Sequence, residues 1–402
     1  YSDFSREITA DTWQWDGSEW IQFAVSPFVI DMSEKPDGIW NFTTIDIGQT
    51  TINFIPNTAN TPVVWLASGN VSIRGTIDIS GKDDKYQTEL EINTPAAGGP
   101  GGFAAGLGGY TTNTTGDDVA GFPGVGPGGG IATTLLDLDG AWDGHHGSYF
   151  NTYGSPSLHT LVGGSGGGGA RTTTFSDTNE WVRGGNGGGG GGALLIASSG
   201  NIFFSGRIIA IGGEGGFEKS KRLSSNFLIT GISRGGSGSG GAVRLVADRI
   251  LGNGFIDATT NANFRHDLNA LEQNYGRIRL ESYYHRVTVR NNIEPSLSFP
   301  KQTLLDGNRP QLVVASIAGQ SVSATPSGDP ATPEVTFSAA GDVTIIVTAN
   351  NLPDATLINL RVTSNSQILT PTPVALSGGE ASFTLSVPAG IGIVQAYADW
   401  TN

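Results

Sequence analysis

The sequence predicts an all-β protein: a parallel β-helix, or solenoid, with long glycine-rich insertions, followed by a C-terminal immunoglobulin-like β-sandwich. Three observations lead to this prediction. A pattern of short apolar strands broken by glycine occurs at 67–79, 197–211 and 242–257, and such units must stack to bury their apolar faces. Glycine accounts for 61 of the 402 residues. Beyond residue 311, short Val-, Ile- and Thr-rich runs alternate with turn residues.

The composition narrows the class of protein. Charged residues make up 14% of the chain, whereas an ordinary soluble domain has about 25%. A net charge of -14 and scattered basic residues argue against a nucleic-acid partner. The absence of cysteine excludes disulfides and thiol chemistry, and no apolar run approaches the roughly 18 residues of a membrane span. The start at Tyr1 favours a mature, secreted chain, located extracellularly or at a cell surface.

Residues 1–44 are predicted to form an aromatic N-terminal strand and cap segment. Trp13, Trp15 and Trp20 flank an Asp-Gly pair, which is typical of a tight hairpin. Their rings would cover the unpaired end of the solenoid. The alternative is that the same three tryptophans form a glycan-binding platform.

The solenoid domain is expected at 45–299, because alternating apolar residues begin at Ile45. Its glycine tracts include 163–169 and 187–192. Two interpretations of these tracts stay open: extended polyproline-II-like segments packed closely together, which glycine alone permits, or mobile loops. Residues 300–310 are predicted to be a linker.

Residues 311–402 are predicted to form the immunoglobulin-like sandwich, because short strands punctuated by turns over about ninety residues are typical of that architecture. The Cys and Trp hallmarks of true immunoglobulin domains are absent, so the prediction concerns architecture only. Strands are expected at 312–316, 335–337, 343–347, 357–362, 381–387 and 391–398.

The densest acidic cluster suggests a calcium site. Asp137, Asp139 and Asp143 surround a glycine turn, and alternate carboxylates of a tight loop can supply oxygen ligands to Ca²⁺. The closing Glu of an EF-hand is missing, and the alternative is a solvated turn. No cofactor is required by the sequence, and calcium is the one ion that it suggests.

Candidates for catalysis are weak. Ser165 lies in a Gly-x-Ser-x-Gly match, but that motif needs a strand before it and a helix after it, and here it sits in a glycine tract. The carboxylates of the repeat units, Asp78, Asp248 and Asp257, occupy different positions in their units and need not share a face. We therefore expect a protein that is not an enzyme.

Residues 69–81 and 240–247 resemble the glycine-rich secreted bacterial surface proteins that have haemagglutinin-like parallel β-helices. The resemblance covers roughly 45–290. It implies a surface, adhesive or fibre-forming role rather than a reaction.

The expected function is that of an extracellular structural protein, a self-assembling subunit of a filament, sheath or surface layer whose partner is another copy of itself. In one version residues 1–12 add a strand to a neighbouring subunit. The alternative is a carbohydrate-binding adhesin of cell-surface or phage-tail type, which contacts glycans through its glycine-rich loops or its N-terminal tryptophans. The third possibility is a polysaccharide-active enzyme.

Overall fold

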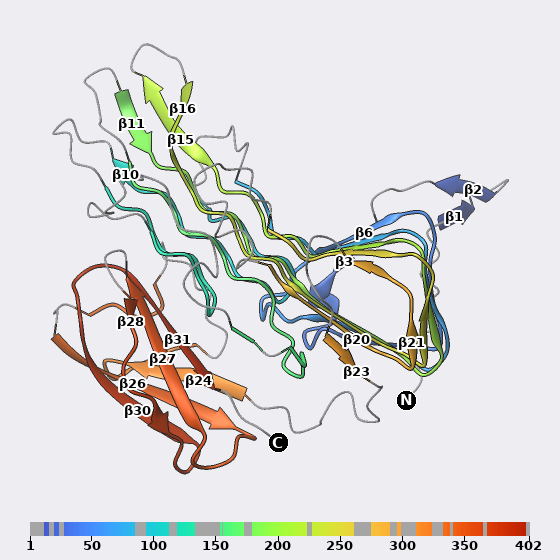
Figure 1. Cartoon of the computed structure of the whole chain (residues 1–402). Coiled ribbons are helices and arrows are strands. Elements are labelled where there is room, and N and C mark those ends of the chain that lie inside the picture. Colours follow the sequence, from blue (N-terminus) through green and yellow to red (C-terminus); the bar gives the residue numbers. More distant parts are fainter. Residues whose placement is uncertain are drawn as a thin grey trace.

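The computed structural model shows an all-β chain, and its described residues contain strands and one short 3-10 helix, Met32–Glu34, but no α-helix (Figure 1). The residues that the structure describes are 12–15, 20–23, 28–84, 94–111, 119–132, 153–154, 156–172, 179–222, 227–260, 275–289, 296–298, 311–323, 333–337, 341–364 and 368–398.

Three parallel sheets form one end of the molecule. Sheet 1 consists of β4 (Ile39–Phe42), β7 (Val63–Ala67), β12 (Ala193–Ser198), β17 (Ala242–Val246), β20 (Arg277–Glu281) and β23 (Ser296–Ser298). Sheet 2 consists of β5 (Ile45–Ile47), β8 (Val71–Ile73), β13 (Asn201–Phe204), β18 (Arg249–Leu251) and β21 (Tyr284–His285). Sheet 3 consists of β3 (Phe28–Asp31), β6 (Thr51–Ile55), β9 (Thr76–Asp78), β14 (Arg207–Ile209), β19 (Phe255–Asp257) and β22 (Thr288–Val289).

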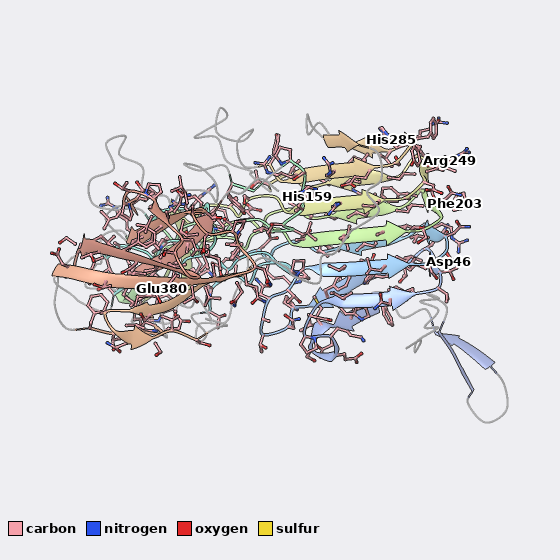
Figure 2. The ribbon with its side chains drawn as sticks, turned by 90° about the horizontal axis from the view of Figure 1, so that it is seen from below. Asp46, His159, Phe203, Arg249, His285 and Glu380 are labelled. Atoms are coloured by element: carbon pink, nitrogen blue, oxygen red, sulfur yellow. The ribbon has the colours of Figure 1, made fainter. Side chains whose placement is uncertain are left out.

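The chain visits sheets 3, 1 and 2 in that order and then begins the cycle again one strand further along (Figure 2). The predicted repeats occupy equivalent positions in successive cycles. Val71 of β8 pairs with Ile202 of β13, and Ile77 of β9 pairs with Ile208 of β14. The third copy continues the column, because Ile208 also pairs with Ile256 of β19. The repeated segments therefore lie side by side in parallel register, as their similarity predicts.

The core of the stack lies between the three sheets and is built from every second residue of each strand. The fully buried Trp65 is its largest side chain, and it contacts the rings of Phe42 and Phe54 at centroid distances of 6.1 and 6.0 Å. Aliphatic side chains fill the rest of the interior. They stack in columns, to each of which every strand of a sheet contributes one residue. Burial of one face of each strand fixes the pairing register, because a shift by one residue would turn the buried side chains outward.

The glycine-rich insertions leave the stack after β9 and β14 and return at β12 and β17, so they all extend from the same corner between sheets 3 and 1 (Figure 1). The segment 184–192 lies among them and hydrogen bonds with five neighbouring segments. Its N–H groups donate to 103–109, 236–239 and 79–82, and its carbonyls accept from 164–170 and 213–216.

The direction of these bonds repeats every three residues. The N–H groups of Gly184, Gly187 and Gly190 all donate to the 103–109 segment, over 2.8–2.9 Å. Three residues per turn without internal hydrogen bonds is the geometry of a polyproline-II helix. Where the structure describes them, the tracts thus follow the first of the two predicted alternatives, close-packed extended segments that bond to one another.

The C-terminal part contains two four-stranded antiparallel sheets that share one apolar core. The strands of the first sheet are β24 (Gln311–Ile317), β25 (Gln320–Ser321), β26 (Gly341–Asn350) and β30 (Glu380–Val387). Those of the second are β27 (Leu357–Ser364), β28 (Ile368–Leu369), β29 (Val374–Ala375) and β31 (Gly392–Ala398). The buried Arg361 of β27 joins this part to the glycine-rich segments by donating to the carbonyls of Pro127, at 2.7 Å, and Gly129, at 3.3 Å.

Several boundaries differ from the sequence prediction. The parallel sheets begin at Phe28 rather than at residue 45, because β3 and β4 already pair with β6 and β7. Residues 335–337, predicted to be a strand, are not one. The predicted linker 300–310 lies outside the described residues.

Candidate functional site

The predicted calcium ligands Asp137, Asp139 and Asp143 lie outside the described residues. Within the described part of the chain, no group of three or more His, Asp or Glu side chains is arranged to hold a metal ion. The calcium hypothesis stays a prediction.

The predicted N-terminal hairpin is present as β1 (Thr12–Trp15) and β2 (Trp20–Phe23). In the antiparallel register Trp15 pairs with Trp20 and Trp13 pairs with Gln22. The two strands form a sheet of their own, and neither pairs with the strands that end the stack. Figure 2 shows the hairpin projecting away from the sheets rather than lying across their end.

The repeat carboxylates are arranged differently from the prediction. Asp78 and Asp257 both pair with Ile209, so they occupy the same column of sheet 3 with one residue between them. Asp257 is fully buried and accepts hydrogen bonds from the backbone and hydroxyl of Thr259, which gives it a structural role. Asp248 is exposed at a different corner. Ser165 is also fully buried, and its Oγ accepts from the Gly128 N–H.

A small antiparallel sheet lies at the end of the glycine-rich segments farthest from the parallel sheets (Figure 1). We call it the tip sheet. Its strands are β10 (Tyr110–Thr111), β11 (Asn179–Arg183), β15 (Phe217–Arg222) and β16 (Phe227–Arg234). Arg183 pairs with both Tyr110 and Lys219, and Trp181 pairs with Lys221, so these positions share one face.

A buried polar cluster lies where the glycine-rich segments enter the tip sheet. Asp84 is 1% exposed, accepts a hydrogen bond from Asn186 Nδ2 at 3.1 Å, and lies 3.7 Å from Lys219 Nζ. The Oδ1 atom of Asn186 accepts from the Gly108 N–H at 2.8 Å and from Arg183 Nη2 at 3.1 Å. The cluster thus ties segments from four distant parts of the chain together. No sequence pattern indicates it, because its members share no spacing.

Burial dominates the electrostatics of this cluster. It raises the pKa of Asp84, although Lys219 and Arg183 partly offset the effect. Burial likewise lowers the pKa of Lys219, against the attraction of Asp84. A folded-state pKa above the unfolded value of 3.8 means that the native state binds the proton more tightly. Protonation of Asp84 therefore adds stability below the unfolded value, and this contribution is lost as the pH rises through the folded value.

Substituting Asp84→Asn should remove this pH dependence. We expect the melting temperature of the wild type minus that of the variant to increase as the pH falls from about 7 to about 4. Thermal melts across the acid range measure the difference, with the exposed Asp342→Asn as a control. A difference in melting temperature that stays constant, or that decreases toward acid pH, would contradict a raised pKa of Asp84.

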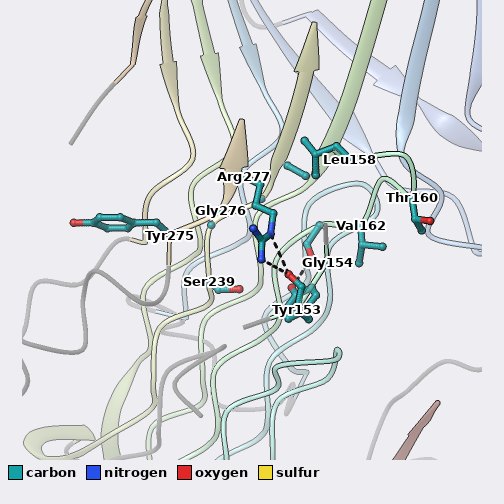
Figure 3. A pocket seen from close by; sticks show the side chains of 13 residues that line it. Tyr153, Gly154, Leu158, Thr160, Val162, Ser239, Tyr275, Gly276 and Arg277 are labelled. Atoms are coloured by element: carbon teal, nitrogen blue, oxygen red, sulfur yellow. Dashed lines mark hydrogen bonds between the residues drawn. The ribbon is translucent and has the colours of Figure 1, made fainter. Parts of the chain in front are cut away.

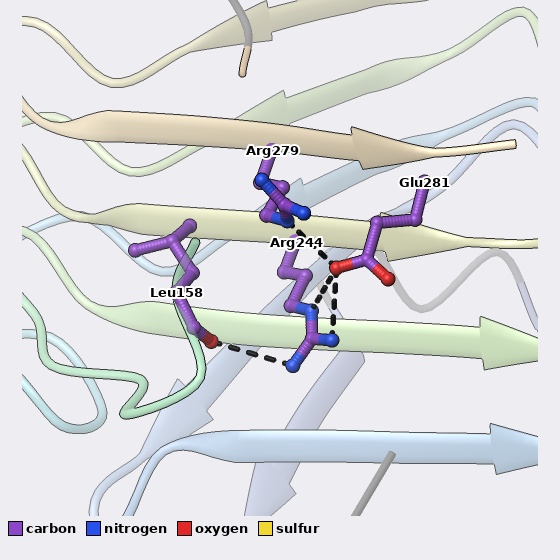
Figure 4. A network of polar contacts seen from close by, with 4 residues as sticks. All are labelled: Leu158, Arg244, Arg279 and Glu281. Carbon is purple, nitrogen blue, oxygen red and sulfur yellow. Dashed lines mark hydrogen bonds and ion pairs between the residues drawn. The ribbon is translucent and has the colours of Figure 1, made fainter. Parts of the chain in front are cut away.

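A second charged network lies on the outer face of sheet 1 (Figure 4). Oε1 of the fully buried Glu281 accepts from Arg279 Nε at 2.7 Å and from Arg244 Nε at 3.0 Å, and Arg244 Nη2 lies 2.9 Å away. Arg244 also donates to the carbonyl of Leu158 at 3.4 Å. Burial lowers the pKa of Arg244, partly offset by Glu281. Alternation of charged residues along β20 is the signal in the sequence that marks this outer face.

A shallow hollow adjoins the network (Figure 3). Arg277 of β20 donates to the carbonyl of Tyr153 from Nε at 3.1 Å and Nη2 at 2.9 Å, and the Tyr153 hydroxyl donates to the carbonyl of Gly163 at 2.6 Å. Ser239 and Tyr275 also line it. The polar groups of the hollow therefore fasten Tyr153 to sheet 1 and Gly163 to Tyr153, which is a structural role.

At both ends of the parallel stack, the described strands leave one sheet edge without a partner. β3, β4 and β5 end their sheets on one side, and β21, β22 and β23 end them on the other, each with one partner strand among the described elements. Near the first end Phe28, Ile30 and Trp40 are only partly buried, although they pack against the core. Unpaired strand edges of this kind are templates for pairing with another chain.

Comparison with known proteins yields no family: no family model, curated protein or solved structure matches this chain. The described part of the chain also contains no helix with the length and apolar character needed to cross a membrane. The functional proposal therefore rests on the geometry above.

Proposed function

We propose that this chain is an extracellular structural protein, a parallel β-helix with a C-terminal immunoglobulin-like sandwich, whose copies assemble end to end into a filament, sheath or surface layer. The observation that carries the proposal is that, among the described strands, each of the three parallel sheets has an edge without a partner at both ends of the stack. The cyclic order in which the chain visits the sheets supports the β-helix.

The direction of the strands favours assembly without a closed ring. All strands of the stack run parallel, so a second copy can place β3 and β4 beside β22 and β23 of the first and continue sheets 3 and 1 at the usual spacing of about 4.8 Å. Sheet 2 has five described strands against six in each of the other two, so β5 of the second copy would lie one strand spacing further from β21. Such a contact joins two different surfaces. It leaves a free end of each kind after every addition, which is the condition for an open polymer.

The apolar residues at the first end support the same contact. Ile30 and Trp40 belong to the inward-facing set and are partly exposed, and no described strand pairs beyond β3 or β4 to cover them. A neighbouring copy would complete their burial, at a gain of about 25 cal/mol for each Å² of apolar surface removed from water.

Adjacent residues of β3 provide a matched test. Ile30→Lys puts a charge into the end layer, whereas Val29→Lys puts the same charge on the outer surface, where Val29 is 48% exposed. We expect the wild type and Val29→Lys to form polymers whose mass rises with protein concentration, and Ile30→Lys to remain monomeric. Analytical ultracentrifugation and electron microscopy measure this. A wild type that stays monomeric at all concentrations, or an Ile30→Lys polymer of normal length, would overturn the proposal.

A further inference from the structure

An exposed aromatic pair lies on the tip sheet. The rings of Tyr110 and Trp181 are 6.3 Å apart between centroids, with an interplanar angle of 37°. Tyr110 is 50% exposed, and Trp181 is half-buried. Two strands of the tip sheet supply the pair, and the hydrogen-bonded glycine-rich segments hold those strands in place. The two rings form an apolar platform on the tip sheet, and this sheet lies at the end of the molecule opposite the parallel sheets (Figure 1).

The strands of the tip sheet are rich in basic residues, whereas the protein as a whole is acidic. Strands β11, β15 and β16 contain five Lys or Arg residues and two Glu residues, whereas the whole chain has a net charge of -14. Arg183 lies opposite Tyr110 in the register and is an electrostatic neighbour of it. The hydrogen bond from Arg183 to Asn186 fixes the orientation of this guanidinium beside the aromatic rings.

We propose that this face of the tip sheet, centred on Tyr110, Trp181 and Arg183, binds an acidic polysaccharide. The flat C–H face of a sugar ring packs on an aromatic face, and the aromatic rings lose little conformational entropy in doing so. A guanidinium recognises a carboxylate or sulfate with two parallel N–H donors. The basic composition of the tip-sheet strands favours an anionic sugar over a neutral one. This site is separate from the three tryptophans of the N-terminal hairpin, and it does not depend on the proposed assembly.

The experiment measures the binding of the full chain to immobilised polygalacturonate and dextran sulfate, with neutral dextran as the uncharged comparison. We expect binding to at least one acidic polymer and not to dextran, with an affinity that falls as the salt concentration rises to roughly 0.5 M. Tyr110→Ala should weaken this binding by about tenfold or more, because the loss of one stacked ring removes much of the contact. Its melting temperature should change little, since half of the side chain is already exposed.

Phe203→Ala serves as the matched control, because Phe203 is an aromatic residue of sheet 2 with 43% exposure and lies outside the tip sheet (Figure 2). This variant should bind like the wild type. The proposal is overturned if neither acidic polymer binds, if dextran binds equally well, or if Tyr110→Ala retains full affinity. Binding that is instead lost in Trp15→Ala, with Tyr110→Ala unaffected, assigns glycan recognition to the hairpin and also overturns it.

Discussion

Replacing Gly190 with alanine should unfold the glycine-rich region. An added Cβ would lie 1.9 Å from the carbonyl oxygen and 2.3 Å from the carbonyl carbon of Gly164. Both are backbone atoms, so no side chain can rotate away to make room. The two segments would have to separate, which breaks the bonds from Gly190 to Phe103 and from Gly164 to Gly191. We expect a loss of about 3 kcal/mol or more in the free energy of unfolding.

Thermal melting and the yield of soluble protein measure this effect. The control is Gly378→Asn, at a turn of the C-terminal sheets where an added Cβ meets nothing within 4 Å. Gly378 has a φ of +59°, a conformation that asparagine tolerates. This variant should melt close to the wild type. A Gly190→Ala protein as stable as the wild type would show that the segments do not pack this closely.

The same crowding explains why the sequence has runs of consecutive glycines. At every position from 187 to 192, an added Cβ would meet a backbone atom at 1.9–2.6 Å. An extended helix with three residues per turn directs successive residues to three sides, and here neighbouring segments occupy every side. Glycine is therefore needed for close approach at each position, rather than for a positive φ at a few of them.

The parallel stack could be predicted because the sequence pattern that indicates it is local and periodic. The segments around Val71 and Ile202 share an order of glycine and aliphatic residues, and that similarity alone places them in equivalent columns. The start of the stack was missed because the residues near Phe28 and Trp40 carry no copy of the glycine pattern. Their place follows from pairing with β6 and β7, which the sequence does not reveal.

The contacts between distant segments could not be predicted. Asp84 and Lys219 meet only because two glycine-rich insertions return to the same place, and no spacing in the sequence encodes that. Tyr110 and Trp181 come together for the same reason, so the aromatic prediction fell on the N-terminal tryptophans, which are neighbours in sequence. Composition left open whether the glycine region is ordered, and it did not indicate which side chains its far end would display.

Replacing Glu281 with glutamine should destabilise the parallel stack. We expect a decrease in the free energy of unfolding similar to that expected for Gly190→Ala. Glu281 is fully buried and is the carboxylate that Arg244 and Arg279 share. Glutamine has nearly the same shape but no charge, so the two guanidinium groups would stay buried without this partner. Removing one member of a buried ion pair typically costs about 3–5 kcal/mol. We expect that decrease in the free energy of unfolding, measured by chemical denaturation.

The size of the glutamine side chain makes this a test of charge rather than of packing. Oε2 of Glu281 has no hydrogen-bond partner among the described residues, so an amide group at that position breaks no bond made there. Glu380→Gln, an exposed substitution on β30, controls for the loss of one negative charge from the whole chain and should change stability by less than about 0.5 kcal/mol. A change in stability of less than about 0.5 kcal/mol for Glu281→Gln would contradict the prediction. It would mean that water reaches the outer face of sheet 1 and solvates both arginines, so that the network adds little to stability.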